Sequence, residues 1–191
     1  MAKANNLAYQ AEPWEEKLNG QIILMSPRPS VNHNQLVGNI YHIFRSYLKG
    51  KTCKAFTDGV DVFLTDKDNV IPDAMIVCNK DIIKPDGIHG APDLVVEVLS
   101  PSTAKNDRGY KKDLYEAAGV KEYWIVDPTM RSIEAYLLSD KRKYVLDGFY
   151  GLFPDNPSIT ELERQESKKE IPVSLYSDFR IPLEEIFYDM L

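Results

Sequence analysis

Apolar residues recur at intervals of three and four in two long stretches of the chain, and each stretch predicts an amphipathic helix. The first covers residues 31–48, and the second covers residues 103–118 and ends at Gly119. Two shorter helices are predicted at residues 13–18, which are acidic, and at residues 182–190. Each long helix has one apolar stripe, so each is expected to cover a sheet or a core on one side.

Short runs of alternating or continuous apolar residues, bounded by turn residues, predict the strands. We expect a strand-rich middle part arranged as a meander, and a helix between two later strands. The strands predicted from these runs are residues 20–25, 52–57, 59–65, 70–78, 93–99, 122–127, 133–138 and 143–150. This order predicts an α/β or α+β fold, with a mixed β-sheet core flanked by helices.

The length of 191 residues suits one domain over residues 1–191, large enough to bury a core. No segment approaches the roughly 18 apolar residues of a membrane span, and the N-terminal residues lack the pattern of a secretory signal. We therefore expect a cytoplasmic protein without membrane contact. Cys53 and Cys78 are expected to be reduced thiols that pack in the interior.

A formal net charge of −6 argues against nucleic-acid binding, because phosphate binders usually have a basic surface. However, a site that gathers carboxylates for a divalent cation is acidic until the cation binds. Residues 100–115 also carry a small positive balance. The basic residues 141–143 indicate a hairpin turn, with a nucleic-acid contact as the alternative.

Two carboxylates interrupt apolar strands. Glu97 lies within DLVVEVL, and Asp73 follows Pro72 at the start of an apolar run. An ionised carboxylate in such surroundings is costly unless it is paired or bound to a metal. Mg²⁺ takes oxygen ligands and uses one or two carboxylates together with water. Asp73 and Glu97 are therefore candidate metal ligands, although a turn role for Asp73 and a solvated strand face for Glu97 are alternatives.

Helical geometry selects a lysine for the same site. At about 100° per residue, Lys111 falls on the apolar face of the helix at residues 103–118, together with Asp107 and Tyr115, whereas Lys112 points to the other side. A lysine beside metal-binding carboxylates can orient or deprotonate water and neutralise charge on a phosphate. The alternative is a lysine that reaches solvent along the helix edge.

At these residues the chain resembles the PD-(D/E)XK nuclease superfamily, most closely its Uma branch of restriction-endonuclease-like proteins. The resemblance rests on Pro72-Asp73, on residues 91–103, on Asp107, Lys111 and Tyr115, and on residues 119–128. It implies a restriction-endonuclease-like core and hydrolysis of phosphodiester bonds, with DNA as the expected substrate. It also implies Mg²⁺, with Mn²⁺ as an alternative, and by analogy a homodimer.

The chain departs from the superfamily pattern at one position. Leu99 stands where the superfamily has a lysine, two residues after the second acid. In the Uma branch a lysine from the next helix is the replacement, and Lys111 matches that position. The expected catalytic set is therefore Asp73, Glu97 and Lys111. Asp107, Tyr115 and His33 are accessory candidates; His33 lies at the start of a predicted helix, where it could contact phosphate or water or simply begin the helix.

Two other functions fit parts of the pattern. A non-catalytic interaction module on the same fold agrees with the missing strand lysine and the acidic total charge. A carrier of a small apolar ligand would need a large apolar pocket and no converging carboxylates. Ser100 and Ser102 lack a partner histidine, so a serine hydrolase is not expected.

Overall fold

The computed structural model describes residues 15–24, 29–153, 160–161 and 168–191. Its strands form two six-stranded sheets and a two-stranded hairpin. One sheet has the order β2-β1-β5-β4-β8-β7, and the other has the order β12-β11-β10-β9-β6-β3. We call them the small sheet and the central sheet, respectively. No helix in the described ranges is long and apolar enough to cross a membrane.

The small sheet consists of β1 (Glu15–Leu18), β2 (Gln21–Leu24), β4 (Val62–Thr65), β5 (Asp68–Val70), β7 (Ile83–Lys84) and β8 (Gly87–His89). The central sheet consists of β3 (Lys54–Thr57), β6 (Ala74–Val77), β9 (Leu94–Val98), β10 (Glu122–Asp127), β11 (Ser132–Leu138) and β12 (Tyr144–Gly151). The remaining elements are β13 (Glu170–Pro172), β14 (Arg180–Pro182), α1 (Val31–Tyr47), α2 (Ala104–Arg108), α3 (Tyr110–Ala118), α5 (Leu183–Ile186) and a 3-10 turn, η1 (Lys80–Ile82).

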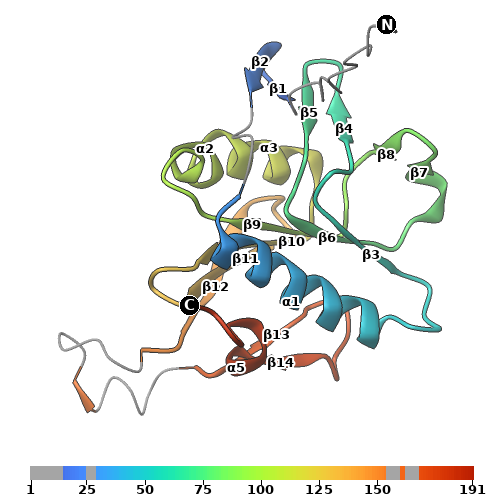
Figure 1. The fold of residues 1–191 in the computed structure, drawn as a ribbon. Helices are drawn as coiled ribbons and strands as arrows, with labels where there is room; N and C mark the ends of the chain where they lie inside the picture. The colour runs from blue at the N-terminus through green and yellow to red at the C-terminus, as the bar shows by residue number, and fades with distance from the viewer. Residues whose placement is uncertain (1–14, 25–28, 154–159, 162–167) are drawn as a thin grey trace, which may run out of the picture.

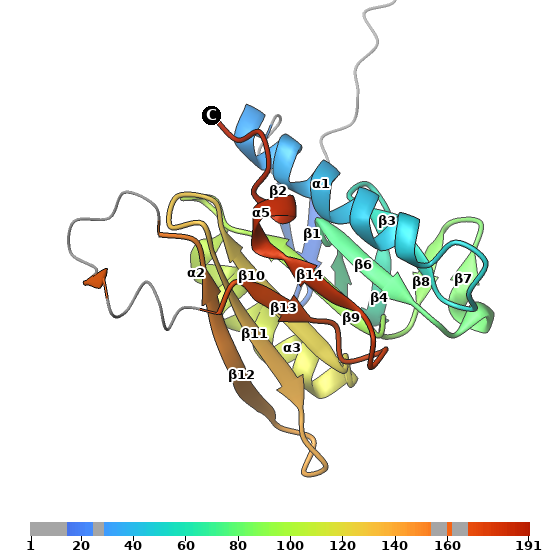
Figure 2. The same cartoon turned by 90° about the horizontal axis from the view of Figure 1, so that it is seen from below.

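The central sheet is mixed, which confirms the predicted fold class. Strands β9 and β10 are parallel and α2 and α3 connect them, whereas β3, β6, β11 and β12 pair antiparallel with their neighbours. Figure 1 shows α2 and α3 on one face of this sheet, with α1 and α5 on the other. In Figure 2 α1, α5 and the β13–β14 hairpin lie together on the face turned to the viewer.

Strand β9 is buried on both faces, and its alternating residues enter two different cores. Val96 and Val98 pack in the core beneath α1, whereas Val95 and Leu99 pack in the core beneath α3 with Tyr115. Since side chains alternate along a strand, Glu97 shares the α3 face with Val95 and Leu99. The fold thus aims this carboxylate at the inner side of α3.

The helix predicted at residues 103–118 is in fact two helices. Gly109 separates α2 from α3 and has backbone angles of φ −113° and ψ −105°, outside the helical region. A Cβ atom on Gly109 would lie 2.9 Å from the Lys105 carbonyl oxygen, so the break suits glycine. Lys111 and Tyr115 follow the break and keep their predicted inward direction. Tyr110 lies on the same predicted helix face, but the break at Gly109 leaves it exposed.

The acidic helix predicted at residues 13–18 is wrong for the described part, since Glu15–Leu18 is strand β1; residues 13 and 14 lie outside the described ranges. The strand forms a hairpin with β2 through Asn19 and Gly20, both with positive φ, 49° and 78°. This is the geometry of a type I′ turn, for which Asn-Gly is the typical sequence. The short-range signal of the turn was therefore present in the sequence.

The predicted meander is also wrong. Strand β3 pairs with β6, and the intervening β4 and β5 belong to the small sheet. The predicted strand at residues 70–78 is divided at residues 71–73, because Pro72 cannot donate to a ladder and the chain passes there from one sheet to the other. Asp73 stands at this crossing.

The C-terminal part contains a hairpin, β13–β14, that the pattern did not predict, and the final helix is limited to Leu183–Ile186. Residues 162–170, whose charged sequence predicts a solvated segment, lie mostly outside the described ranges. The basic residues 141–143 lie in the turn between β11 and β12, where Arg142 has φ 55°, so the hairpin-turn interpretation is confirmed.

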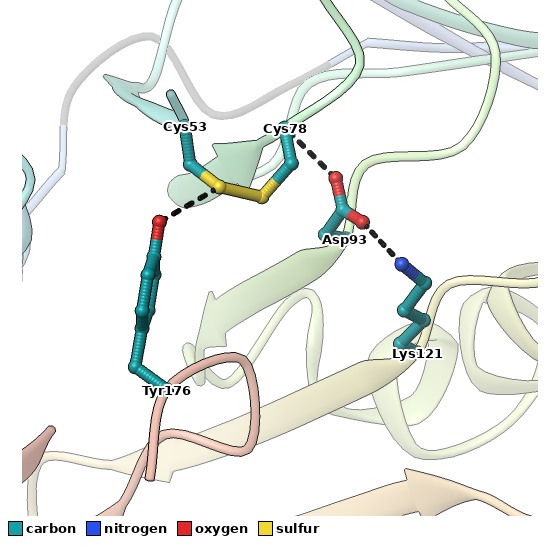
Figure 3. Close-up of a disulfide and its surroundings, with 5 residues drawn as sticks. All are labelled: Cys53, Cys78, Asp93, Lys121 and Tyr176. Atoms are coloured by element: carbon teal, nitrogen blue, oxygen red, sulfur yellow. Dashed lines mark hydrogen bonds and ion pairs between the residues drawn. A yellow bond between two sulfur atoms is a disulfide. The ribbon is translucent and has the colours of Figure 1, made fainter. Parts of the chain in front are cut away.

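The prediction of free thiols is wrong, because Cys53 and Cys78 form a disulfide with Cα atoms 3.9 Å apart. The cause is the β3–β6 register, which pairs Lys54 with Val77 and so places the two cysteines opposite each other. Figure 3 shows the bond with its polar neighbours: the Tyr176 hydroxyl lies 3.1 Å from Cys53 Sγ, and Asp93 accepts a hydrogen bond from the Cys78 backbone N–H. Asp93 also accepts a hydrogen bond from Lys121, so it has a structural role at the entrance of β9.

Candidate active site

The ends of β6 and β9 bring Asp73 and Glu97 together. These strands are antiparallel, and Ala74 pairs with Val96, so the same register places Asp73 next to Glu97. Residues directly opposite in such a pair have Cβ atoms about 5 Å apart. Asp73 Oδ2 also accepts a hydrogen bond of 2.6 Å from the Val98 N–H, which ties the carboxylate to β9.

Glu97 is fully enclosed, and two side chains of α3 hold it. The Tyr115 hydroxyl donates to Glu97 Oε1 at 2.6 Å, and the Lys111 ammonium donates to the same oxygen at 3.1 Å. Burial raises the pKa of Glu97 well above its usual range, and the negative charges of Asp107, Asp73 and Glu16 raise it further, although Lys111 opposes them. The ionised form of Glu97, which is the form that binds a cation, therefore needs a positive charge nearby to be stable.

Lys111 is the central cation of the site and is only 3% exposed. Its Nζ lies 2.7 Å from Glu16 Oε1, 3.1 Å from Glu97 Oε1 and 3.8 Å from Asp107 Oδ1. Burial acts to lower the pKa of Lys111, but the three carboxylates outweigh it and raise this pKa above its ordinary value. Lys111 is therefore an ammonium ion at neutral pH.

Glu16 is a member of this cluster that sequence reasoning missed. It is 5% exposed, and its Oε1 accepts a hydrogen bond of 2.9 Å from the Ile71 N–H in addition to the contact with Lys111. The signal was the alternation of buried Glu16 and Leu18 beside an Asn-Gly turn, which predicts a strand with Glu16 facing inward. The incorrect helix prediction at residues 13–18 concealed it.

Asp107 is the least satisfied carboxylate. It is 1% exposed, and within the described part of the chain neither of its oxygens accepts a hydrogen bond of good geometry, although the Thr103 hydroxyl is near enough to lower its pKa. Burial raises the pKa of Asp107 to about 6, against the lowering effect of Lys111. A buried carboxylate without a good hydrogen-bond partner costs stability, so Asp107 would gain from a water molecule or a ligand beside it.

His33 stands at the edge of the site, in the first turn of α1. Ser30 caps this helix by accepting a hydrogen bond from the His33 N–H, and the His33 imidazole Nε2 lies 3.1 Å from Asp73 Oδ1. Burial lowers the pKa of His33, but the hydrogen bond and the charge of Asp73 outweigh it, so the pKa is raised. His33 thus lies in the capped first turn of the helix and also contacts the candidate ligand Asp73.

The carboxylates of this site suit a hard cation such as Mg²⁺, provided that water molecules supply the remaining ligands. Among the residues the structure describes, no three His, Cys, Asp or Glu side chains are arranged to hold a metal ion on their own. Mg²⁺ does not require three, because it usually binds one or two carboxylates and keeps several waters. The adjacent carboxylates of Asp73 and Glu97, with the unpartnered oxygens of Asp107 close by, match that requirement in chemistry.

The geometry separates the predicted accessory residues from their neighbours. Asp107, Tyr115 and His33 each contact a member of the catalytic set. In contrast, Lys112 extends over the ring of Tyr136, away from the carboxylates. A carrier of a small apolar ligand is expected to have no converging carboxylates. The carboxylates around Lys111 therefore argue against that function.

Comparison with known proteins agrees with this picture. The model of the Uma2 family, described as a putative restriction endonuclease, matches residues 5–168. The uncharacterised protein slr1290 of Synechocystis is 30% identical over 142 residues, which are 70% of this chain and 74% of that one. A second Synechocystis protein, sll1609, is 24% identical over 146 residues, 74% of this chain and 82% of that one.

A solved structure matches nearly the whole chain. The crystal structure of a putative nuclease belonging to DUF820 from Anabaena variabilis superposes with a TM-score of 0.69 at 20% sequence identity. The match covers 95% of this chain and 93% of that chain. At this identity the likeness establishes the fold.

Proposed function

Because the chain belongs to the Uma2 family of putative restriction endonucleases, we propose that it is a Mg²⁺-dependent endonuclease that hydrolyses phosphodiester bonds of DNA. The proposed catalytic residues are Asp73, Glu97 and Lys111. Asp73 and Glu97 would hold the cation, and Mn²⁺ would substitute for Mg²⁺. Asp107, Tyr115 and His33 would support them.

The observation that carries the proposal is an excess of buried carboxyl groups over buried cations. Four carboxylates, those of Glu16, Asp73, Glu97 and Asp107, are at most 9% exposed. Three of them, Glu16, Glu97 and Asp107, surround one buried ammonium, that of Lys111. The fourth, Asp73, lies next to Glu97 and contacts His33 at the edge of the site. A buried charge without compensation is strongly unfavourable, and a divalent cation would supply what Lys111 alone does not.

Each residue has a chemical task that follows from its contacts. Glu97 is fixed by Tyr115 and Lys111, so its carboxylate direction is set before substrate arrives. Asp73 is fixed by the Val98 N–H and by His33. Since Lys111 is protonated, it would stabilise negative charge that develops on the phosphate and orient water as a donor, and it would not act as a base.

When bound, Mg²⁺ would supply a Lewis acid that polarises the phosphate and lowers the pKa of water. The oxygen atoms of Asp73 and Glu97 suit this hard cation, and the free oxygens of Asp107 could hold one of its waters. DNA as the substrate and a homodimer that presents two sites to the two strands are parts of the proposal that rest on the family.

Incubation of purified protein with plasmid, single-stranded DNA and RNA, each with Mg²⁺, Mn²⁺ or chelator, tests this function. We expect metal-dependent cleavage of DNA and a loss of at least about 100-fold in the Glu97→Gln variant. The matched control is Glu122→Gln, a buried glutamate of the same sheet that bonds Trp124 and Ser174 instead. Failure of the wild type to cut any substrate, or equal rates in both variants, would refute the proposal.

A non-catalytic module on the same fold is the second candidate. The net charge of −6 and Leu99 at the position of the strand lysine favour it. This module would need no cation, whereas the proposed enzyme requires one. Absence of both metal binding and cleavage would favour the module.

A further inference from the structure

Glu16 reaches the candidate site from outside the central sheet. It lies on β1 of the small sheet, whereas Glu97 lies on β9 of the central sheet and Lys111 lies on α3. Leu18, two residues further along β1, is 5% exposed and packs in the core beneath α3. The β1–β2 hairpin therefore places Glu16 in the site, although Glu16 is not part of the sequence motif that contains the proposed catalytic residues.

One oxygen of Glu16 contacts two parts of the site. Its Oε1 accepts from the Lys111 ammonium at 2.7 Å and from the Ile71 N–H at 2.9 Å. Ile71 lies two residues before Asp73, in the segment that crosses between the sheets. The contact with Glu16 is also the shortest of the three carboxylate contacts of Lys111.

The position of the ammonium decides what remains available to a cation. Lys111 has three donors, and it directs two of them at Glu16 and Glu97. Asp107 is left at 3.8 Å, beyond hydrogen-bond distance, and neither of its oxygens accepts a hydrogen bond of good geometry; the Thr103 hydroxyl is its one polar neighbour besides Lys111 that lowers its pKa. If Glu16 carried no charge, the Lys111 ammonium would be drawn toward Asp107, the next carboxylate in its surroundings.

We propose that Glu16 is a positioning residue that draws the Lys111 ammonium away from Asp107 and so keeps the Asp107 carboxylate free to support the bound cation. This inference rests on the proposed function for the part that concerns the cation. The part that concerns Lys111 stands on the apoprotein alone. The small sheet is then a component of the site, and the cation site is completed only when the β1–β2 hairpin is in place.

The variant Glu16→Gln tests this role, because it removes the charge and keeps the shape and the acceptor for Ile71. Glu15→Gln, the exposed neighbour on the same strand, is the matched control. A double-mutant cycle combines Glu16→Gln with Lys111→Met and measures the equilibrium constant of unfolding. We expect the effect of Glu16→Gln on this constant to differ about tenfold between the proteins with and without Lys111. We expect no such difference for Glu15→Gln. Equal coupling for both residues would overturn the claim about Lys111, whether or not the protein binds metal.

A second cycle pairs Glu16→Gln with Asp107→Asn and reads the Mn²⁺ dissociation constant by calorimetry. If Glu16 acts through Lys111 on Asp107, Glu16→Gln weakens Mn²⁺ binding about tenfold alone and has no further effect in Asp107→Asn. Independent, multiplicative effects would mean that Glu16 acts as a ligand or by its charge alone, and would overturn the inference. Absence of Mn²⁺ binding by the wild type would contradict the proposed function and this second step, but not the Lys111 coupling.

Discussion

Lys111 Nζ lies 3.1 Å from Glu97 Oε1, although Lys111 belongs to helix α3 and Glu97 to strand β9. The two meet because α2 and α3 form the crossover between the parallel strands β9 and β10, which lays α3 over the face that Glu97 shares with Leu99. An ammonium from a helix thus stands beside the strand carboxylate, while the strand position two residues on is apolar. This geometry supports Lys111 as the functional lysine.

Replacing Lys111 with methionine should strongly destabilise the metal-free protein. The change leaves Glu16 and Glu97 buried without their cation, and the loss of one partner from a buried ion pair costs about 3–5 kcal/mol. Urea unfolding at neutral pH in chelator measures the effect. Lys112→Met on the same helix is the control, since Lys112 lies over the Tyr136 ring and outside the cluster. A loss in Lys111→Met no larger than in Lys112→Met would show that the cluster is not paired as described.

The raised pKa of Asp107 predicts a pH dependence of stability without metal. Its folded pKa is about 6, above the ordinary value of 3.8, so folding favours the protonated form. The resulting stabilisation is fully present below about pH 4 and is lost as the pH rises through 6. Relative to Asp107→Asn, the free energy of unfolding of the wild type should therefore fall by on the order of 3 kcal/mol between pH 4 and 7.

Urea titrations of both proteins across this range, in chelator, give that difference directly. Groups distant from Asp107 cancel in the comparison, because the two proteins share them. Glu97 adds to the difference in the same direction, because the charge of Asp107 raises its pKa in the wild type alone. A difference that stays constant with pH would contradict the raised pKa of Asp107. Mn²⁺ added at pH 7 should restore stability to the wild type by binding the folded state.

The disulfide predicts sensitivity to reductant. It closes a loop with a sequence separation of 25 residues, which includes the Asp73 segment (Figure 3 shows the bond itself). Constraint of the unfolded chain by such a loop is worth about 3 kcal/mol. Urea unfolding with and without a phosphine reductant should show this loss, and a Cys53→Ser, Cys78→Ser double variant should be insensitive. Two reactive thiols in the unreduced, denatured protein would contradict the bond.

Local patterns predicted the elements whose signals are strong and periodic. Helix α1 and strands β9 and β10 appear where the spacing of apolar residues placed them, and Glu97 stood out because it interrupts an otherwise apolar run. The helical phase of Lys111 survived the break at Gly109, because Lys111 and Tyr115 follow the break together. Chemistry that depends on one element and its immediate neighbours was therefore accessible.

Features that depend on pairing between distant strands were not accessible. The disulfide requires β3 to lie against β6, and the position of Glu16 requires the small sheet to fold over α3. Both follow from strand order, which periodicity does not encode. For Glu16, the Asn19-Gly20 turn indicated a strand, but the acidic residues before it favoured a helix. Glu16 was therefore not among the predicted site residues.

Binding of Mn²⁺ tests the central claim most directly, since it requires no knowledge of the substrate. Calorimetric titration of the wild type should show one saturable site, weakened at least about tenfold in Asp73→Asn and in Glu97→Gln. Asp93→Asn should bind as the wild type does, because Asp93 bonds Cys78 and Lys121 away from the cluster. Absence of saturable binding, or equal affinity in all four proteins, would contradict a cation site at Asp73 and Glu97.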